Sequence, residues 1–298
     1  MQQDRILRAL AYDDTVRIFF CRTTELVRTC CEKHQTWPQV SIAMGRALSV
    51  GALMGATLKE DEHQLALEWK GDGPMRRVVV DARANGNLRG YPLHPQVGMP
   101  PRSKVIPQSV SELLGKAGFV HVMHDLGLKD IYRSTVPLSS GEIGPDMAFY
   151  YAQSEQIPSA IGVECFLDEE GQVKSAGGWM VQMMPNVEEG TLQHFEQRLQ
   201  QDQLLAFLHR DEPLTQSIAD FLQTSHTVLE QKPLRFYCPC TVERVSRTLI
   251  SLGRQELQNL LLGDQEIEVL CDFCRTRYTF QDMEIQKLLA EVEDALQV

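Results

Sequence analysis

The pattern of hydrophobic and polar positions divides the first 184 residues into short strands and a few helices. Residues 64–69 alternate between apolar and polar side chains, which is typical of a half-buried strand. Further strands are predicted at residues 16–20, 75–82, 88–91, 119–126, 131–136, 161–167 and 173–184. Helices are predicted at residues 23–34, from a cap at Thr36 through Leu58, and from Pro145 onwards. Because strands and helices form separate runs, the pattern predicts an α+β fold with antiparallel-rich sheets.

The pattern changes between residues 185 and 232, where two amphipathic stripes follow each other. The first stripe contains Leu192, Phe195, Leu199, Leu204, Leu205 and Leu208, and the second contains Leu214, Ile218, Phe221 and Leu222. Each stripe predicts a helix with one apolar face, and such a face needs another surface to cover it. Two interpretations stay open: a helical subdomain docked permanently on the sheet, or a metastable linker whose apolar faces become exposed when its neighbour unfolds.

Four of the eight cysteines lie in the last quarter of the chain, in two close pairs. Cys238 and Cys240 flank Pro239, and 30 residues later Cys271 and Cys274 form a C-x-x-C pair. Four thiolates from two such pairs are typical of a tetrahedral site, and Zn²⁺ is the ion that all-sulfur sites most often select. The sequence therefore predicts one Zn²⁺ per chain in the reduced state, held by all four cysteines.

A metal at this site would change both the stability and the reactivity of the segment. It would close a loop of about 30 residues, whereas disulfides within each pair would leave the two segments unlinked. Structural zinc supplies about 10 to 16 kcal/mol in small modules, more than a core of some 60 residues provides alone. Exposed coordinated thiolates also react with oxidants. From spacing alone, an inert zinc ribbon and an oxidant-sensing switch both remain open.

Composition limits the class of protein. The chain is long enough for two domains, and its N-terminus has no apolar signal region. The longest weakly polar run, residues 40–58, contains Arg46 and many small residues, which favours a buried helix over a membrane span. Thiols in metal-ligand spacing without a signal peptide favour the reducing cytoplasm. Four other cysteines show no ligand spacing and are interpreted as packed thiols without an assigned role: Cys21, Cys30, Cys31 and Cys165.

Charge argues against a nucleic-acid partner, and the motifs identify no active site, although an enzyme stays possible at this point. The net charge is −11, and residues 233–298 contain 7 basic and 11 acidic side chains, so the segment lacks the basic surface that binds phosphate backbones. The chain has no P-loop, no G-x-G-x-x-G and no H-E-x-x-H motif. His121 and His124 lie in a strand-like segment, where positions three apart face opposite sides.

Several motifs together resemble one family. The two cysteine pairs follow Lys70-Gly71-Asp72-Gly73-Pro74, Ser154-Glu155-Gln156-Ile157-Pro158-Ser159, Ala176-Gly177-Gly178 and Gln182-Met183-Met184-Pro185. In this order they are similar to the bacterial redox-regulated 33 kDa chaperonins, a family of heat-shock holdases. The resemblance covers essentially the whole chain.

The resemblance implies a specific organisation and function. It implies an α+β core domain at residues 1–184, a helical linker at 185–232 and a zinc-binding redox-switch domain at 233–298. The protein would be an ATP-independent stress-response chaperone, and not an enzyme, that is inactive while reduced and zinc-loaded. The alternative is a zinc-ribbon adaptor that binds a nucleic acid or a protein partner.

The resemblance also implies how such a chaperone is activated. Oxidation would form the disulfides Cys238–Cys240 and Cys271–Cys274, release Zn²⁺ and unfold the linker. The exposed surface would then bind unfolding client proteins. The protein would be a homodimer when oxidised and a monomer or weak dimer when reduced, with no nucleic-acid or membrane partner.

Overall fold

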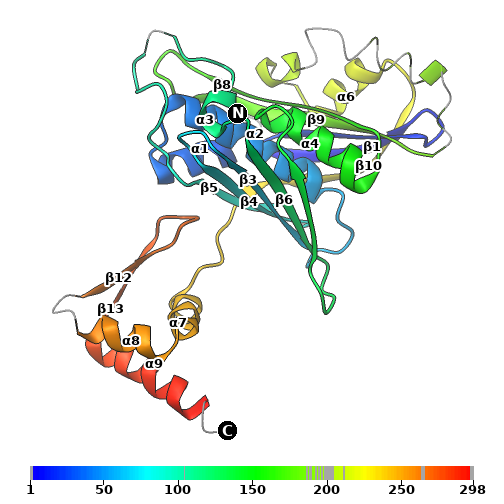
Figure 1. The fold of residues 1–298 in the computed structure, drawn as a ribbon. Coiled ribbons are helices and arrows are strands. Elements are labelled where there is room, and N and C mark those ends of the chain that lie inside the picture. Colours follow the sequence, from blue (N-terminus) through cyan, green and yellow to red (C-terminus); the bar gives the residue numbers. More distant parts are fainter. Residues whose placement is uncertain are drawn as a thin grey trace. The chain divides into compact units, whose positions relative to one another are not determined.

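The computed structural model describes residues 3–295 except for Lys104, Asn186, Glu188, Glu189, Leu192, His194, Glu196, 198–204, Asp211 and 263–265. The chain divides into two compact units, Met1–Tyr237 and Cys238–Val298 (Figure 1). We call them unit 1 and unit 2. Within the part of the chain that the structure describes, no helix is both long and apolar enough to cross a membrane.

Unit 1 contains two sheets, and the α+β class predicted from the sequence is confirmed. The five-stranded sheet has the strand order β10-β1-β2-β9-β8, and the six-stranded sheet has the order β11-β5-β4-β3-β6-β7. Neighbouring strands are antiparallel except β11 and β5. The strands are β1 (Arg5–Ala11), β2 (Val16–Arg22), β3 (Gln64–Gly71), β4 (Arg77–Arg83), β5 (Asn87–Pro92), β6 (Gly118–Asp125), β7 (Tyr132–Pro137), β8 (Ser159–Leu167), β9 (Val173–Met183), β10 (His226–Pro233) and β11 (Arg235–Phe236).

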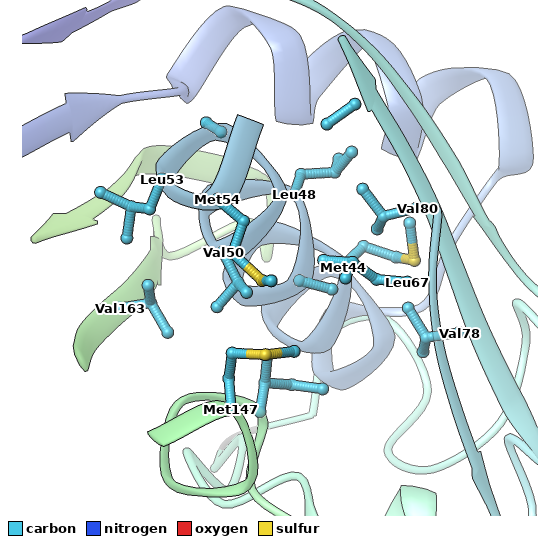
Figure 2. Close-up of a cluster of buried hydrophobic side chains, with 14 of the residues drawn as sticks. Met44, Leu48, Val50, Leu53, Met54, Leu67, Val78, Val80, Met147 and Val163 are labelled. Atoms are coloured by element: carbon cyan, nitrogen blue, oxygen red, sulfur yellow. The ribbon is translucent and has the colours of Figure 1, made fainter. Parts of the chain in front are cut away.

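One long helix, α2 (Pro38–Gly55), connects the cores of the two sheets. It contacts β8 and β9 of the five-stranded sheet and β4 and β5 of the six-stranded sheet, and every one of its residues is buried. Figure 2 shows Met44, Leu48 and Val50 of this helix within one apolar cluster. Small residues allow α2 to lie close to β4, since a Cβ at Gly51 would lie only 2.6 Å from Val80 Cγ1.

The start of α2 corrects one sequence prediction. Trp37, and not Thr36, is the cap residue, and the helix ends at Gly55 rather than at Leu58. Pro38 occupies the first helical position, where its fixed φ suits a helix and its missing N–H costs nothing. The residue before a proline is held in an extended conformation, so the helix cannot begin earlier. The other helices of unit 1 whose bounds the structure describes are α1 (Thr24–His34), α3 (Ser111–Leu114), α4 (Ile143–Tyr150), a π-helical turn η1 (Tyr151–Glu155), the 3₁₀ turn η2 (Ala206–His209) and α6 (Leu214–Leu222).

The outer face of the five-stranded sheet is apolar and covered by the predicted linker range. Strand residues Ile18, Phe20 and Trp179 form a second core cluster with Phe207 and Phe221 of the covering segment. The helix predicted from the second stripe is α6, whose Leu214, Ile218 and Leu222 are also buried there. From the first stripe, Phe195, Leu205 and Leu208 belong to the same cluster or pack on it, whereas Leu192, Leu199 and Leu204 lie outside the described residues.

Two strands of the five-stranded sheet were missed by the sequence analysis, as were β11 and the two hairpin strands of unit 2. β1 and β10 pair with each other, and β10 lies inside the range that was predicted to be a helical linker. It is an edge strand with a register shift opposite Arg8/Ala9, and its Val228 and Leu229 are exposed. Because backbone hydrogen bonds rather than a buried face hold such an edge strand, it leaves no alternating hydrophobic signal.

Unit 2 has its own small core. It consists of α7 (Val242–Ser251), α8 (Arg254–Leu261), the hairpin β12 (Ile267–Leu270) and β13 (Arg277–Phe280), and α9 (Asp282–Ala295). Thr241 caps α7, since its hydroxyl accepts a hydrogen bond from the Arg244 N–H at 3.3 Å. Among the described residues, the core cluster consists of Val245, Leu249, Leu257, Phe280, Ile285 and Leu288.

Candidate metal centre

The four cysteines of unit 2 converge on one point. The Sγ atoms of Cys238, Cys240, Cys271 and Cys274 all lie within 4.8 Å of one another. The Cys240 and Cys274 sulfurs are 3.2 Å apart, and the Cys238 and Cys271 sulfurs are 3.8 Å apart. Tetrahedral zinc with Zn–S bonds of about 2.3 Å spaces its sulfurs by about 3.8 Å. The arrangement therefore has the size and the donor atoms of a four-sulfur metal site.

Local backbone structure brings the two pairs together. Cys238 and Cys240 lie in the segment directly before α7. Cys271 and Cys274 lie in the turn between β12 and β13, which closes through hydrogen bonds from the Cys271 N–H to the Thr276 carbonyl and from the Arg275 N–H to the Cys271 carbonyl. Arg275 adopts a left-handed conformation with φ of 58° at this turn. The hairpin thus points both downstream sulfurs toward the upstream pair.

Two hydroxyl groups lie next to the sulfurs. The Tyr278 hydroxyl donates a hydrogen bond to Cys240 Sγ at 3.1 Å. Thr276 Oγ1 lies 3.2 Å from Cys274 Sγ. The sequence analysis did not identify either residue as part of the site, because their role depends on the register of the β12–β13 hairpin.

The electrostatics of the cluster favour a cation. Burial raises the pKa of Cys271 to about 12, and burial also raises the pKa of Cys240. Burial acts in the same direction on Cys274, but hydrogen bonds from Thr276 and from the neighbouring thiols overcome it and lower the pKa of Cys274 to about 7. A divalent ion would stabilise the remaining thiolates, which otherwise repel one another.

The other four cysteines lie elsewhere, in unit 1. Cys21, Cys30, Cys31 and Cys165 are all buried, and burial raises the pKa of each thiol. Cys30 donates to the Gly90 carbonyl at 3.3 Å, and Cys21 donates to the Ser49 carbonyl at 3.7 Å. These thiols are packed in the core and stay protonated at neutral pH.

The histidines that the sequence analysis considered do not form a site together. Both lie on β6, and His121 and His124 point to opposite faces of the sheet. The His121 ring nitrogen lies 2.9 Å from Thr135 Oγ1, whereas the His124 ring packs beside Tyr132 at 6.0 Å between centroids.

A buried arginine was not found from the sequence but has a clear structural role. Arg22 on β2 donates hydrogen bonds to the carbonyls of Phe207 and Arg210, both at 3.0 Å, and to the carbonyl of Glu212 at 3.3 Å. It lies on the same face of β2 as Ile18 and Phe20. One guanidinium therefore binds the irregular backbone between η2 and α6 to the sheet.

Comparison with known proteins agrees with these features. A family model described as Hsp33 protein matches residues 4–281. The chain belongs to the Hsp33 family. A 33 kDa chaperonin of Geobacillus sp. (strain WCH70) is 38% identical over 297 residues, which cover 98% of this chain and 99% of that protein. A 33 kDa chaperonin of Bacillus subtilis (strain 168) is 34% identical over 288 residues, which cover 96% of this chain and 98% of that protein.

A solved structure is similar to this chain over almost its full length. The crystal structure of a 33 kDa chaperonin, a heat shock protein 33 homolog from Thermotoga maritima, matches with a TM-score of 0.87 and 30% sequence identity. The match covers 98% of this chain and 100% of that chain. Since the relatives in the Hsp33 family are named chaperonins, membership supports a chaperone function and not an enzymatic one.

Proposed function

We propose that this protein is an ATP-independent chaperone that a four-thiolate zinc site keeps inactive and that oxidation activates. The observation that carries the proposal is the convergence of four sulfurs within 4.8 Å, in a unit whose described core cluster has six buried side chains with eight partly buried ones packed against them. Cys238, Cys240, Cys271 and Cys274 would hold one Zn²⁺ per chain in the reduced state. The ion would supply the cross-link and the folding free energy that so small a core lacks.

Oxidation would remove this cross-link. We propose disulfides within each pair, Cys238–Cys240 and Cys271–Cys274, as the family resemblance implies. Each disulfide forms when two thiols lose two electrons and two protons to a hydroperoxide, which leaves as water and an alcohol or as two waters. Such bonds close only very short loops, so the segment before α7 and the β12–β13 hairpin would no longer be joined.

Loss of unit 2 would loosen the segment at residues 185–232, which precedes it in the chain. Its helix α6 has nine residues, too few to be stable in water without docking. Docking rests on the apolar cluster around Phe20 and on the three hydrogen bonds from Arg22. Release would expose an apolar helix face and an apolar sheet face, including Ile18 and Trp179. Surfaces of this kind bind unfolding proteins.

We further propose unfolding client proteins as partners, a homodimer in the oxidised state, a monomer or weak dimer in the reduced state, and a location in the reducing cytoplasm. A nucleic-acid partner is disfavoured because residues 233–298 carry more acidic than basic side chains. The same charge balance disfavours the alternative function as a zinc-ribbon adaptor for nucleic acids.

Light scattering of a thermally unfolding client protein tests the proposal. Zinc-loaded reduced protein should leave client aggregation unchanged, whereas peroxide-treated protein should suppress it at roughly equimolar ratio without ATP. Re-reduction with added zinc provides the control. Equal suppression by both forms, or salt-sensitive nucleic-acid binding by the reduced form, would contradict the proposed function.

A further inference from the structure

Two arginines of the five-stranded sheet lie close together on one face. Arg17 of β2 lies opposite Leu10 of β1, and Arg8 lies two positions before Leu10. Positions two apart on a strand share a face, and such diagonal neighbours are about 7 to 8 Å apart, within reach of long side chains. Phe19, which lies opposite Arg8, belongs to the core cluster around α2, so both arginines lie on the α2 side of the sheet.

Arg17 is a half-buried cation without a carboxylate partner. Its Nε and Nη2 donate to Gln182 Oε1 at 3.2 Å and 2.7 Å, and its Cζ lies 5.6 Å from the centroid of the Phe19 ring. Within the described part of the chain, Nη1 has no hydrogen-bond partner and is open to solvent. Burial lowers the pKa of Arg17, the phenol of Tyr151 opposes this shift, and the positive charge of Arg8 adds to it.

Arg8 also has unused donors. Its Nη1 lies 3.5 Å from the Ala56 carbonyl, its Nη2 lies 3.8 Å from Glu230 Oε2, and its Nε is buried without a partner among the described residues. Glu230 lies closer to Lys232, at 2.9 Å. Ala56 is the C-cap of α2, and a helix end corresponds to only about half a negative charge. These groups do not balance two guanidinium ions, so the site keeps a positive charge in a chain with a net charge of −11.

The unused donors come from two strands, which suits a ligand with several oxygens. A planar carboxylate is satisfied by one guanidinium fork, whereas a tetrahedral phosphate group can accept from two forks at once. We propose that Arg8 and Arg17 form an anion site that binds a phosphate group, either as inorganic phosphate or on a small phosphorylated molecule. Bound phosphate would join β1 to β2 and stabilise unit 1 as its concentration rises. The site does not rest on the proposed redox switch, because its residues all lie in unit 1.

Isothermal titration calorimetry of the reduced, zinc-loaded full chain tests the site. Sodium phosphate replaces sodium chloride at constant ionic strength, so that general salt effects cancel. The wild type should bind one phosphate per chain. Arg17→Met and Arg8→Met should each weaken binding about 10- to 100-fold, the range for one hydrogen bond to a charged group.

A matched control is Arg77→Met. Arg77 lies on β4 of the other sheet, where its guanidinium already binds the Glu68 carboxylate at 3.2 Å. This variant should bind phosphate with the wild-type affinity. Glu230→Gln removes the carboxylate that competes for Arg8 and should strengthen binding about 2- to 10-fold. A purely structural role for the two arginines would not produce affinity changes of opposite sign.

Two further ligands define the class of anion. Acetate should bind at least about 10-fold more weakly than phosphate, because it lacks the oxygens for a second fork. Glycerol 3-phosphate distinguishes the two sources of the phosphate group. Binding as tight as that of inorganic phosphate supports a phosphorylated molecule as the ligand, and weaker binding supports the free ion.

The inference is overturned if the wild type shows no saturable phosphate binding, if acetate binds equally well, or if Arg17→Met and Arg8→Met keep the wild-type affinity. If Arg17→Met does not fold, Arg8→Met and Glu230→Gln decide, and unchanged affinity in both overturns the inference. Zinc content and the response to peroxide should be the same in all these variants. Failure of the phosphate site therefore leaves the proposed function intact, and reduced protein without zinc would leave the phosphate site intact.

Discussion

Each unit of this protein contains four cysteines, and the two groups lie in opposite environments. In unit 1 the thiols come from a helix or a strand, are separated from solvent, and have their pKa raised by burial. In unit 2 three of the four are partly exposed, and all four sulfurs converge within 4.8 Å. The same residue type therefore packs in the core of one unit and forms a cluster of converging sulfurs in the other.

The difference follows from how each unit obtains its stability. Unit 1 buries the whole of α2 between two sheets and a second cluster under α6. The described core cluster of unit 2 has six buried side chains with eight partly buried ones packed against them, a small core for a segment of about 60 residues. We therefore expect unit 1 to fold without metal and unit 2 to depend on it.

The largest expected effect is that of removing one sulfur of the cluster. Cys271→Ser should reduce zinc content from one per chain to near zero, because three thiolates leave the coordination incomplete. Loss of the metal removes up to about 10 to 16 kcal/mol of folding free energy, so unit 2 should unfold. The thermal unfolding transition of unit 1 should stay unchanged. Elemental analysis and calorimetry measure both quantities.

Cys165→Ala provides the control for this variant. It removes a buried thiol from unit 1, next to Gly45 of α2, and should lower the melting temperature of unit 1 without changing zinc content. Equal zinc loss in both variants would refute the distinction between the two groups of cysteines.

A smaller effect is expected from Arg22→Met, which should loosen the segment between η2 and α6 while zinc stays bound. Three backbone carbonyls would lose a charged donor, so amide exchange at residues 206–222 should rise about 10- to 100-fold. The matched control is Arg17→Met on the opposite face of β2, where the guanidinium donates to Gln182 Oε1 at 2.7 Å. If both variants loosen the segment equally, Arg22 has no specific role.

The smallest effect concerns the pH dependence of unit 1. Burial, with a minor contribution from Glu25, raises the pKa of Asp4 from 3.8 to about 6, although the Leu26 N–H donates to its carboxylate at 2.6 Å. The folded state thus binds this proton more tightly than the unfolded state. The stability contribution of Asp4 is complete below about pH 4 and is lost as pH rises through about 6.

Asp4→Asn removes this titration and keeps an acceptor for Leu26. Between pH 5 and pH 7.5 the wild type should lose about 1 kcal/mol more stability than the variant. Urea denaturation at the two pH values measures the difference. The difference should appear in the unfolding transition of unit 1, because unit 2 responds to metal. Parallel pH profiles of stability for the wild type and for Asp4→Asn would contradict the prediction.

The sequence predicted the α+β class and most of the elements of unit 1, because buried strands and helices leave periodic hydrophobic patterns. The four clustered cysteines were also found from the sequence, since their spacing alone implies convergence. Tyr278 and Arg22 were missed for a physical reason. Each acts on a partner far away in the chain, a sulfur 38 residues from Tyr278 and carbonyls more than 180 residues from Arg22. No local pattern encodes such contacts.

Amide hydrogen exchange before and after peroxide treatment tests the central claim most directly. We predict that oxidation releases one zinc per chain and makes the described residues of the 187–232 range exchange rapidly. The strands between Gln64 and Val136 should stay protected, because α2 and the six-stranded sheet do not depend on the metal. Zinc release with unchanged protection of residues 187–232 would contradict the coupling between the two units and with it the proposed switch.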